Sequence, residues 1–436
     1  MAQAHVQTRA FNPRTFATLF FCGMAYAITY AAPFVQYVLY DPTLKALGAT
    51  NAQLGILVMI FGWGNIVGAP LGGILSDKFN HKTIYIGGLL GTSLLSVLLA
   101  YNLNYDFALF VFGGFAVTGL FMLFPAHIKV VRLLTDENSQ GKVFGFAEAF
   151  AGLGSVIVNT IALTVFAWYT DEVLGFKYVL VFFGVCGVAC AAVLYFLVDG
   201  PAKLREKGII EEGQREKIAF ADFIAVLRCP GTWFAGIAVF STYTLYCSIS
   251  YFTPYFTKVL GVSVVFSGSL AIIRTYVIRF VMSPVGGMLG DKLGSVTKVL
   301  MISWIGAAVI VATIMLLPAG APLGIAIMLM LLMGVFTFTA RGSMFAVPSE
   351  VKIPVKYAAI TAGIVCAIGY SPDLFIFILF GHWIDTYGNA AYNYIFIYDI
   401  VVCAIGVVSA LLTFRYKRRF AAQAGVPAGA TANVTA

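Results

Sequence analysis

The chain has 436 residues, of which 60% are hydrophobic and only 11% are charged. This composition excludes a water-soluble globular protein and indicates an integral membrane protein. The formal net charge is +8, but the basic residues lie in short loops rather than in one stripe. Anionic lipid headgroups are therefore the expected counter-charge, and a nucleic-acid partner is not expected.

Twelve stretches of the sequence are long and apolar enough to cross a bilayer as helices, since a span needs about 20 such residues. The sequence therefore predicts an all-α membrane protein. The twelve stretches run approximately over residues 15–39, 51–75, 83–101, 106–130, 143–169, 178–198, 231–256, 262–289, 299–317, 323–346, 357–383 and 391–416.

Basic residues set the expected orientation of these spans. When the spans are threaded alternately, 21 of the 27 Lys and Arg residues fall on one side, and only Lys45, Lys177 and Lys258 fall on the other. The positive-inside rule then places both termini and the central loop in the cytoplasm. The first fifteen residues are polar and no cleavable signal peptide is visible, so the first helix is expected to remain in the protein. The expected location is the inner or plasma membrane.

Motifs for metal binding and catalysis are missing from the sequence. None of the seven cysteines forms Cys-x-x-Cys, and His-Glu-x-x-His, Gly-x-Ser-x-Gly and a phosphate loop ending in Gly-Lys-Ser/Thr do not occur. We therefore expect no enzyme activity, no metal and no cofactor.

A nine-residue pattern occurs twice, at Pro70–Lys78 and Pro284–Lys292, with an offset of 214 residues. An even number of spans separates the copies, so the halves are expected to be parallel repeats of six helices each. The expected domains are an N-terminal bundle at 1–199, a cytoplasmic linker at 200–228, a C-terminal bundle at 229–419 and a disordered tail at 420–436. Residues 220–228 are expected to form a short interfacial helix.

Glycines recur in and next to each copy at a spacing of four residues, which places them on one helix face. They are expected to let neighbouring backbones approach closely there. These glycines are Gly64, Gly68 and Gly72 in the first half and Gly286, Gly290 and Gly294 in the second.

The first copy, extended to Gly73-Ile-Leu75-Ser-Asp77-Lys78-Phe-Asn80-His81-Lys82, resembles the signature loop between the second and third helices of the major facilitator superfamily. Residues 287–298 resemble its weaker second copy. The resemblance implies the two-half fold and alternating access. Asn80 replaces the family's usual glycine and is expected to tolerate a left-handed conformation, and His81 replaces a usual arginine.

Six residues of these two loops and their surroundings are the cytoplasmic gate that the resemblance implies. Arg132 is the implied partner of Asp77, since an Asp at a helix C-terminus is unfavourable unless a cation meets it. The alternative is a charged turn that only follows the positive-inside rule. The gate residues are Asp77, Lys78, Lys82, Arg132, Asp291 and Lys292.

Six charged residues fall inside predicted spans, where a charge costs about 2.5 to 3.5 kcal/mol even on the lenient insertion scale. Three cations and three anions balance formally, so pairing within the protein is an alternative to ligand binding. The six are Arg274, Arg279, Arg341, Glu148, Asp373 and Asp399.

Arg274 lies near the middle of the eighth span, about 25 Å from Asp291 at 1.5 Å per residue. Arg279 is about 140° further round the helix, so one arginine is expected to bind substrate and the other to brace the fold. Oxalate/formate-type and related organic-anion permeases carry a basic residue on this helix, and this resemblance favours Arg274 for substrate. The alternative is a structural pair of Arg274 with Asp373 or Asp399.

Arg341 and His127 lie 214 residues apart, at equivalent positions of the two halves. Together they are expected to flank a central anion site. Two alternatives remain at this stage: Arg341 gates the cytoplasmic side with Glu350, and His127 is simply hydrogen-bonded.

Asp373 follows Pro372, which is expected to break the eleventh helix. Asp373, and with it Asp399, is a candidate proton carrier or counter-ion for an arginine. Glu148 is a weaker candidate for the same role. It is expected to be mainly structural, paired with Lys129, Arg132 or Lys142.

Tyrosines complete the candidate substrate site. Tyr26 and Tyr30 share one face of the first span, and Tyr243 and Tyr246 share one face of the seventh. Their hydroxyls suit a carboxylate or phosphoryl oxygen. The alternative is an interfacial aromatic belt, which Tyr251 and Tyr255 are expected to fit better.

The sequence thus predicts a secondary transporter that functions as a monomer, rather than a channel, receptor or enzyme. The expected solute is a small organic anion, a carboxylate or phosphorylated metabolite, moved by exchange or with protons. The alternative is a proton-coupled carrier of a neutral or cationic solute with Asp373 as the coupling site, and drug efflux is a further possibility.

Overall fold

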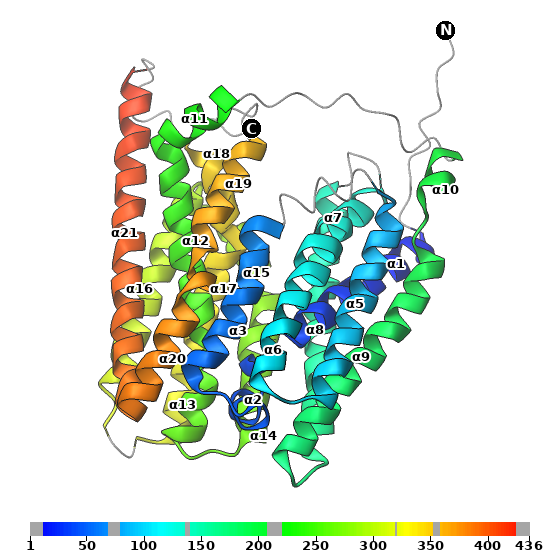
Figure 1. Cartoon of the computed structure of the whole chain (residues 1–436). Helices are drawn as coiled ribbons and strands as arrows, with labels where there is room; N and C mark the ends of the chain where they lie inside the picture. Colours follow the sequence, from blue (N-terminus) through cyan, green and yellow to red (C-terminus); the bar gives the residue numbers. More distant parts are fainter. Residues whose placement is uncertain are drawn as a thin grey trace. The chain divides into compact units, whose positions relative to one another are not determined.

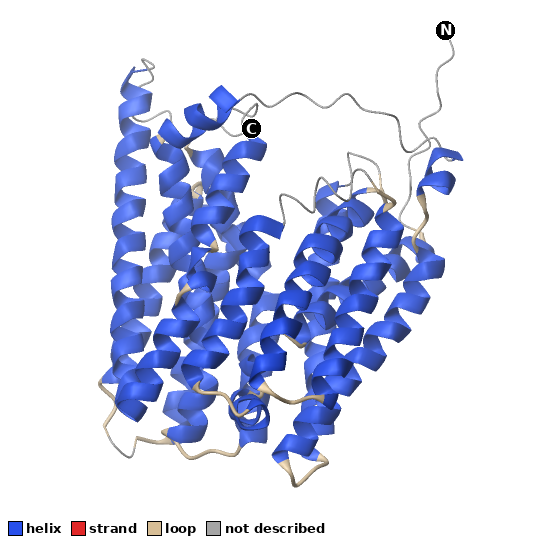
Figure 2. Cartoon of the chain, in the orientation of Figure 1, coloured by secondary structure: helices blue, strands red, loops and turns tan. Residues whose placement is uncertain are grey.

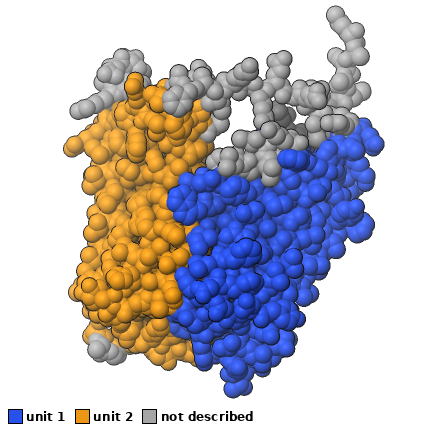
Figure 3. Space-filling view, viewed as in Figure 1, with its two compact units in different colours: residues 1–49, 60–214 blue, residues 50–59, 215–436 orange. Residues whose placement is uncertain are grey.

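The computed structural model describes residues 12–68, 79–135, 140–206, 220–318, 321–351 and 358–423. All regular structure in these ranges is helical (Figure 2). The chain divides into two compact units, one of residues 1–49 and 60–214 and the other of residues 50–59 and 215–436 (Figure 3). The finer boundaries expected at 199, 228 and 419 stay a prediction.

In the first unit, α1 packs against α8 and α9, and α5 packs against α9 and η3 (Figure 1). The π-helical segments η2 and η3 also contact each other. The helices of this unit are α1 (Pro13–Ala31), η1 (Val35–Tyr37), α2 (Tyr40–Leu47), η2 (Gly64–Gly68), α5 (His81–Tyr101), α6 (Tyr105–Phe115), η3 (Ala116–Leu123), α7 (Phe124–Arg132), α8 (Gln140–Ala167), α9 (Glu172–Leu197) and α10 (Pro201–Glu206).

In the second unit, α12 packs against α19 and α21, α16 packs against α17 and α21, and α15 packs against α17. Helix α3 (Asn51–Trp63) is shared between the units. The other helices are α11 (Phe220–Arg228), α12 (Pro230–Ser248), η5 (Ile249–Tyr251), α13 (Phe252–Lys258), α14 (Val264–Ile272), η6 (Ile273–Val277), α15 (Ile278–Leu293), α16 (Val296–Met315), α17 (Leu323–Ser343), η7 (Met344–Ala346), α18 (Val347–Glu350), α19 (Ala358–Gly369), η9 (Ser371–Leu374), α20 (Ile376–Tyr387), η10 (Gly388–Ala390) and α21 (Ala391–Gln423).

Helices occupy all twelve predicted stretches. Within the described ranges, nine helices are long and apolar enough to cross a membrane. The first and seventh stretches lie outside these nine, and the eleventh is divided between the shorter apolar helix Ile360–Gly369 and the candidate span Ile376–Arg418. Helices α1 and α12 have 19 residues each, and polar residues lower their hydropathy: Arg14, Thr and Tyr in α1, and Ser, Thr and Tyr in α12. They are also the helices that carry the two tyrosine pairs.

Short polar side chains start several helices. The side chain of Asn12 accepts a hydrogen bond from the Thr15 amide at 2.8 Å, with Pro13 in the first turn of α1. Asn80 caps α5 in the same way, through the Lys82 amide at 3.0 Å. Its φ of −64° and ψ of 109° are extended, so the expected left-handed conformation is wrong. The side chain of Asn80 serves as the hydrogen-bond acceptor that the N-terminus of α5 needs.

Glycines bring α15 and α17 into backbone contact. A Cβ atom on Gly286 would lie 2.0 Å from the Thr339 carbonyl oxygen, and one on Gly342 would lie 1.9 Å from the Ser283 carbonyl oxygen. The expected close approach is therefore confirmed at Gly286. It is wrong for Gly294, which ends α15 in a left-handed conformation with φ of 60°. Gly72 lies outside the described residues.

The expected helix at residues 220–228 is present as α11. The interfacial reading of Tyr251 is wrong, since its side chain is buried and its hydroxyl donates to the Phe377 carbonyl oxygen at 3.0 Å. Tyr255 is half-buried and packs edge-on against Tyr392, at 5.1 Å between ring centroids. Both tyrosines contribute to packing within the second unit.

Candidate substrate-binding site

A cation–π cluster forms in the second unit where α17 meets α12. The guanidinium carbon of Arg341 lies 4.0 Å from the ring centroid of Tyr246 and 5.5 Å from that of Tyr243. Close packing of α15 on α17 through Gly342 fixes this end of α17. A desolvated cation over tyrosine rings is stabilised by about 2 kcal/mol. The tyrosine pair of α12 therefore supports a positive charge, as its shared helix face predicts.

One nitrogen of Arg341 is available for a ligand. Nη1 is buried and has no hydrogen-bond partner among the described residues. Arg279 is close enough for its charge to act on Arg341. Two like charges near one another favour an anion between or beside them.

Asp373 adjoins this cluster through Tyr243. The Tyr243 hydroxyl donates to Oδ2 of Asp373 at 2.9 Å, and the Cys247 thiol lies 3.7 Å from Oδ1. Asp373 is 1% exposed. It lies in η9, where Pro372 interrupts the helical run between α19 and α20, so the predicted break of the eleventh helix is confirmed.

Asp399 is the second buried carboxyl group of this unit. It comes from α21, is 1% exposed, and accepts a hydrogen bond from the Ser248 hydroxyl at 2.6 Å. Ser248 directly follows Cys247, so neighbouring residues of α12 contact the two carboxyl groups.

Arg274 occupies a different environment. It lies in the π-helical segment η6 and is 1% exposed. Nη2 donates to Thr253 Oγ1 at 3.2 Å, Nη1 lies 3.5 Å from Met330 Sδ, and the Phe252 ring centroid is 6.0 Å from the guanidinium carbon. Asp399 is not its partner. Both terminal nitrogens of Arg274 therefore contact protein atoms, whereas its Nε is buried without a hydrogen-bond partner among the described residues.

In the first unit, the two tyrosines of α1 adjoin His127. The ring centroids of Tyr26 and Tyr30 are 4.5 Å apart, and Tyr26 lies 5.6 Å from the His127 ring. Nδ1 of His127 lies 3.1 Å from the Tyr85 hydroxyl. Glu148 is exposed and acts electrostatically on His127. The hydrogen-bonded reading of His127 accordingly has a named partner, Tyr85.

The sequence profile of the Major Facilitator Superfamily matches residues 15–371. The chain belongs to the major facilitator superfamily. It is a multi-pass membrane transporter and not an enzyme. Two relatives from Escherichia coli K12 match nearly the whole chain. Inner membrane protein YqcE is 27% identical over 93% of this chain and 96% of its own length, and inner membrane protein YihN is 29% identical over the same shares.

Other matches are more distant or partial. The Staphylococcus aureus quinolone resistance protein NorA is 26% identical over 47% of this chain and 51% of its own length. A bacterial homologue of the human lysosomal transporter Spinster, solved in an inward-facing and unoccupied conformation, aligns with a TM-score of 0.70 at 16% identity. That alignment covers 94% of this chain and 98% of the other, and it shows the major facilitator fold.

The gate residues that the superfamily resemblance implies are only partly visible. Asp77 and Lys78 lie outside the described residues. Lys82 lies 4.4 Å from the Tyr195 ring centroid, and Arg132 is exposed at the end of α7. Asp291 and Lys292 are exposed, and their side chains make no hydrogen bond or ion pair with any residue that the structure describes.

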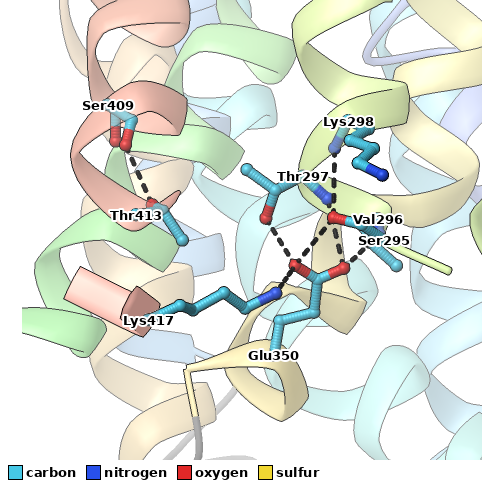
Figure 4. A network of polar contacts seen from close by, with 8 residues as sticks. All are labelled: Ser295, Val296, Thr297, Lys298, Glu350, Ser409, Thr413 and Lys417. Carbon is cyan, nitrogen blue, oxygen red and sulfur yellow. Dashed lines mark hydrogen bonds and ion pairs between the residues drawn. The ribbon is translucent and has the colours of Figure 1, made fainter. Parts of the chain in front are cut away.

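Glu350 instead carries the polar network at this end of the transporter's second unit (Figure 4). It accepts hydrogen bonds from the Val296 amide, from Thr297 Oγ1 at 2.7 Å and from Ser295 Oγ at 3.2 Å, and it pairs with Lys417 of α21. Burial raises the pKa of Glu350, but the hydrogen bonds from Lys417 and Thr297 outweigh burial and hold it below its ordinary value. Glu350 therefore joins α16, α18 and α21 and is not the partner of Arg341.

Sequence reasoning missed Tyr85, Cys247, Ser248 and the Glu350–Lys417 pair. Cys247 follows Tyr243 by four residues and so lies on the same helix face. This spacing could have predicted that Cys247 lies near the site. The partners of Glu350 carry no such signal, because they lie at the start of α16 and in α21, far from Glu350 in the sequence.

Proposed function

We propose that this transporter carries a small organic anion, a carboxylate or phosphorylated metabolite, by alternating access. The observation that supports this most is Arg341, which is held on the Tyr246 ring while its Nη1 has no hydrogen-bond partner within the described ranges. The planar guanidinium group binds carboxylate and phosphate oxygens with two parallel hydrogen bonds. Arg341 is thus the proposed anion ligand.

The nearby charges fit the same proposal. The positive charge of Arg279 repels the positive charge of Arg341, and a bound carboxylate would offset that repulsion. Tyr243 links the cluster to Asp373, which is the proposed counter-ion. Both Arg274 and Arg341 are candidate anion ligands from the sequence. Arg274 contacts Thr253 and Met330, so we propose that it braces the fold and that Arg341 binds the anion. Tyr26, Tyr30 and His127 stay proposed substrate contacts.

A thermal-shift screen of small carboxylates, sugar phosphates and neutral solutes tests the solute class. A specific ligand raises apparent stability by mass action. We expect anions alone to stabilise the protein, and Arg341→Ala to remove the shift while Arg228→Ala, at an exposed position, retains it. Stabilisation by neutral solutes with no response to anions would contradict the proposal.

The second candidate is a proton-coupled carrier of a neutral or cationic solute. Its support is Asp373, a buried carboxyl that accepts hydrogen bonds from Tyr243 and Cys247. The NorA likeness, which covers about half of each chain, is compatible with drug efflux as a form of this candidate. In proteoliposomes, Asp373→Asn would then retain counterflow exchange and lose uptake driven by a pH gradient.

We further propose that both termini are cytoplasmic and that the host membrane is the bacterial inner membrane. The distribution of Lys and Arg supports the orientation, and the names of YqcE and YihN support the location. Cysteine labelling from each side of the membrane at an engineered terminal cysteine tests the orientation. Labelling only from the cytoplasmic side is expected.

A further inference from the structure

Asp399 is a buried carboxyl group without a cation. It is 1% exposed, and its one hydrogen-bond donor in the described part of the chain is the Ser248 hydroxyl, 2.6 Å from Oδ1. No described Lys, Arg or His forms an ion pair with it. Asp373, by comparison, accepts from both Tyr243 and Cys247 and adjoins the Arg341 cluster.

The groups around Asp399 do not supply a compensating charge. Cys247 of α12 and Tyr398 and Cys403 of α21 are its electrostatic neighbours, and each is neutral at pH 7 in its protonated form. Tyr243 of α12 donates to Asp373 instead. The hydroxyl of Ser248 is a neutral donor.

The other helices packed against α21 carry few charges. Helix α16 has only Lys298, in its first turn beside the Glu350 network. Helix α20 has His382, which is exposed, Asp385, which accepts from the Ala52 amide at 2.8 Å, and the exposed Tyr387. The basic residues at the end of α21 begin at Arg415, 16 residues or about 24 Å along the helix.

We infer that Asp399 holds a proton in this conformation and is the carboxyl group through which transport is coupled to protons. A carboxylate buried in a membrane helix without a cation is unfavourable, whereas the neutral acid needs only hydrogen bonds. The inference rests on the proposed function for its transport role. It assigns Asp373 to the counter-ion role and Asp399 to the proton.

The fold connects this proton to the anion cluster. One segment of α12, Tyr243 to Ser248, contacts Arg341, Asp373 and Asp399. When Asp399 releases its proton to water, it becomes a carboxylate that needs water or a cation in place of its neutral neighbours. Release therefore requires α12 and α21 to rearrange around Asp399, which makes protonation depend on conformation. One monoanion and one proton moving together carry no net charge.

Infrared spectroscopy of the reconstituted full chain tests the protonation without any substrate. A protonated carboxyl group gives a C=O stretching band that a carboxylate lacks. We expect part of this band at neutral pH to vanish in Asp399→Asn and to persist in Asp106→Asn, an exposed aspartate of the first unit. In Ser248→Ala the same component should move to higher frequency, because the carbonyl loses its donor. An unchanged band in both Asp399→Asn and Ser248→Ala would overturn the inference.

Transport assays test the coupling role. With a carboxylate that stabilises the wild type, Asp399→Asn should retain exchange and lose the acceleration by an inward proton gradient. Gradient-driven uptake at the wild-type rate in this variant would overturn the coupling role. Failure of the proposed function is distinct, because then no anion stabilises the wild type although the infrared component still depends on Asp399. If Asp399→Asn does not fold, Ser248→Ala decides the infrared test.

Discussion

The candidate sites of the two units differ in how many charged residues they contain. In the first unit the candidate site is built of Tyr26, Tyr30 and a His127 that contacts Tyr85. In the second unit the candidate site contains Arg341 together with two buried carboxyl groups, Asp373 and Asp399. His127 and Arg341 lie at equivalent positions of the repeat. Duplication has thus preserved the scaffold, while ionic chemistry is concentrated in one copy.

The ion pairs of Glu350 and Arg14 repeat this difference. In the second unit Glu350 pairs with Lys417 and accepts hydrogen bonds at the start of α16, with the Glu350 side chain 12% exposed. In the first unit Arg14 pairs with Asp199 at 3.1 Å, and the Arg14 side chain is 51% exposed. Removing one partner from a partly buried network costs more stability than removing one partner from an exposed pair.

The largest expected effect is on stability, from Glu350→Gln. Loss of the ionised acceptor weakens the hydrogen bonds from Lys417, Thr297 and the Val296 amide, and we expect a loss of about 2 kcal/mol. Thermal unfolding of the purified protein measures it. Glu206→Gln, at an exposed position, is the matched control and should change little.

The same residue gives a pH dependence. The pKa of Glu350 is lower in the folded protein than its ordinary value, so its contribution is complete above the ordinary pKa and is lost as the pH falls through the folded-state pKa. The stability gap between wild type and Glu350→Gln should therefore narrow in acid, below about pH 4.5. A gap of constant size down to acid pH would show that Glu350 does not stabilise as a carboxylate.

The tyrosine pairs give the next effect. Tyr246→Leu removes the ring beneath Arg341, so we expect anion binding to weaken by about tenfold. Tyr30→Leu in the first unit removes ring contacts with Tyr26, Phe34 and Phe61, and a smaller loss is expected. Titration of a stabilising carboxylate into each variant measures both. Equal losses would mean that the two units share the ionic role.

His127→Asn should change anion binding by less than about threefold, because asparagine retains a hydrogen-bond acceptor for Tyr85 and neither side chain needs to be charged. The binding titration used for the tyrosines applies. A loss as large as that of Tyr246→Leu would identify His127 as a cationic ligand. Both units would then contribute a positive charge to anion binding.

The smallest effect is expected at the exposed pair. Asp199→Asn removes the ionic partner of Arg14, and exposed pairs contribute about 0 to 1 kcal/mol. Thermal unfolding should hardly change. A loss comparable to that of Glu350→Gln would remove the contrast between the Glu350 network and the Arg14–Asp199 pair.

Much of the fold could be predicted from the sequence. Hydropathy located all twelve helical stretches, and Pro372 predicted the break before α20. Two expectations failed for local reasons. Asn80 supplies an N-cap acceptor, and Gly294 supplies a left-handed helix end, so each residue type fits a role other than the one predicted.

The site was harder to predict than the fold, because residue spacing gives the direction of a side chain only where the helix is a regular α-helix. The π-helical segment at Ile273–Val277 contains Arg274 and changes the angle per residue between Arg274 and Arg279. The position of an arginine within a predicted span could therefore indicate that it is buried. It could not indicate which arginine faces Tyr246. The partners of Asp399 and Glu350 come from distant segments, and no local spacing predicts them.

The most direct test of the central claim compares Arg341→Lys with Arg274→Lys in equilibrium binding of a stabilising carboxylate. Lysine retains the charge but cannot form the paired hydrogen bonds of a guanidinium group. We expect Arg341→Lys to weaken binding by at least about tenfold, which corresponds to the loss of a charge-assisted hydrogen bond. Arg274→Lys should bind within about threefold of wild type. Wild-type affinity in Arg341→Lys, with a loss in Arg274→Lys, would contradict the assignment of the anion to Arg341.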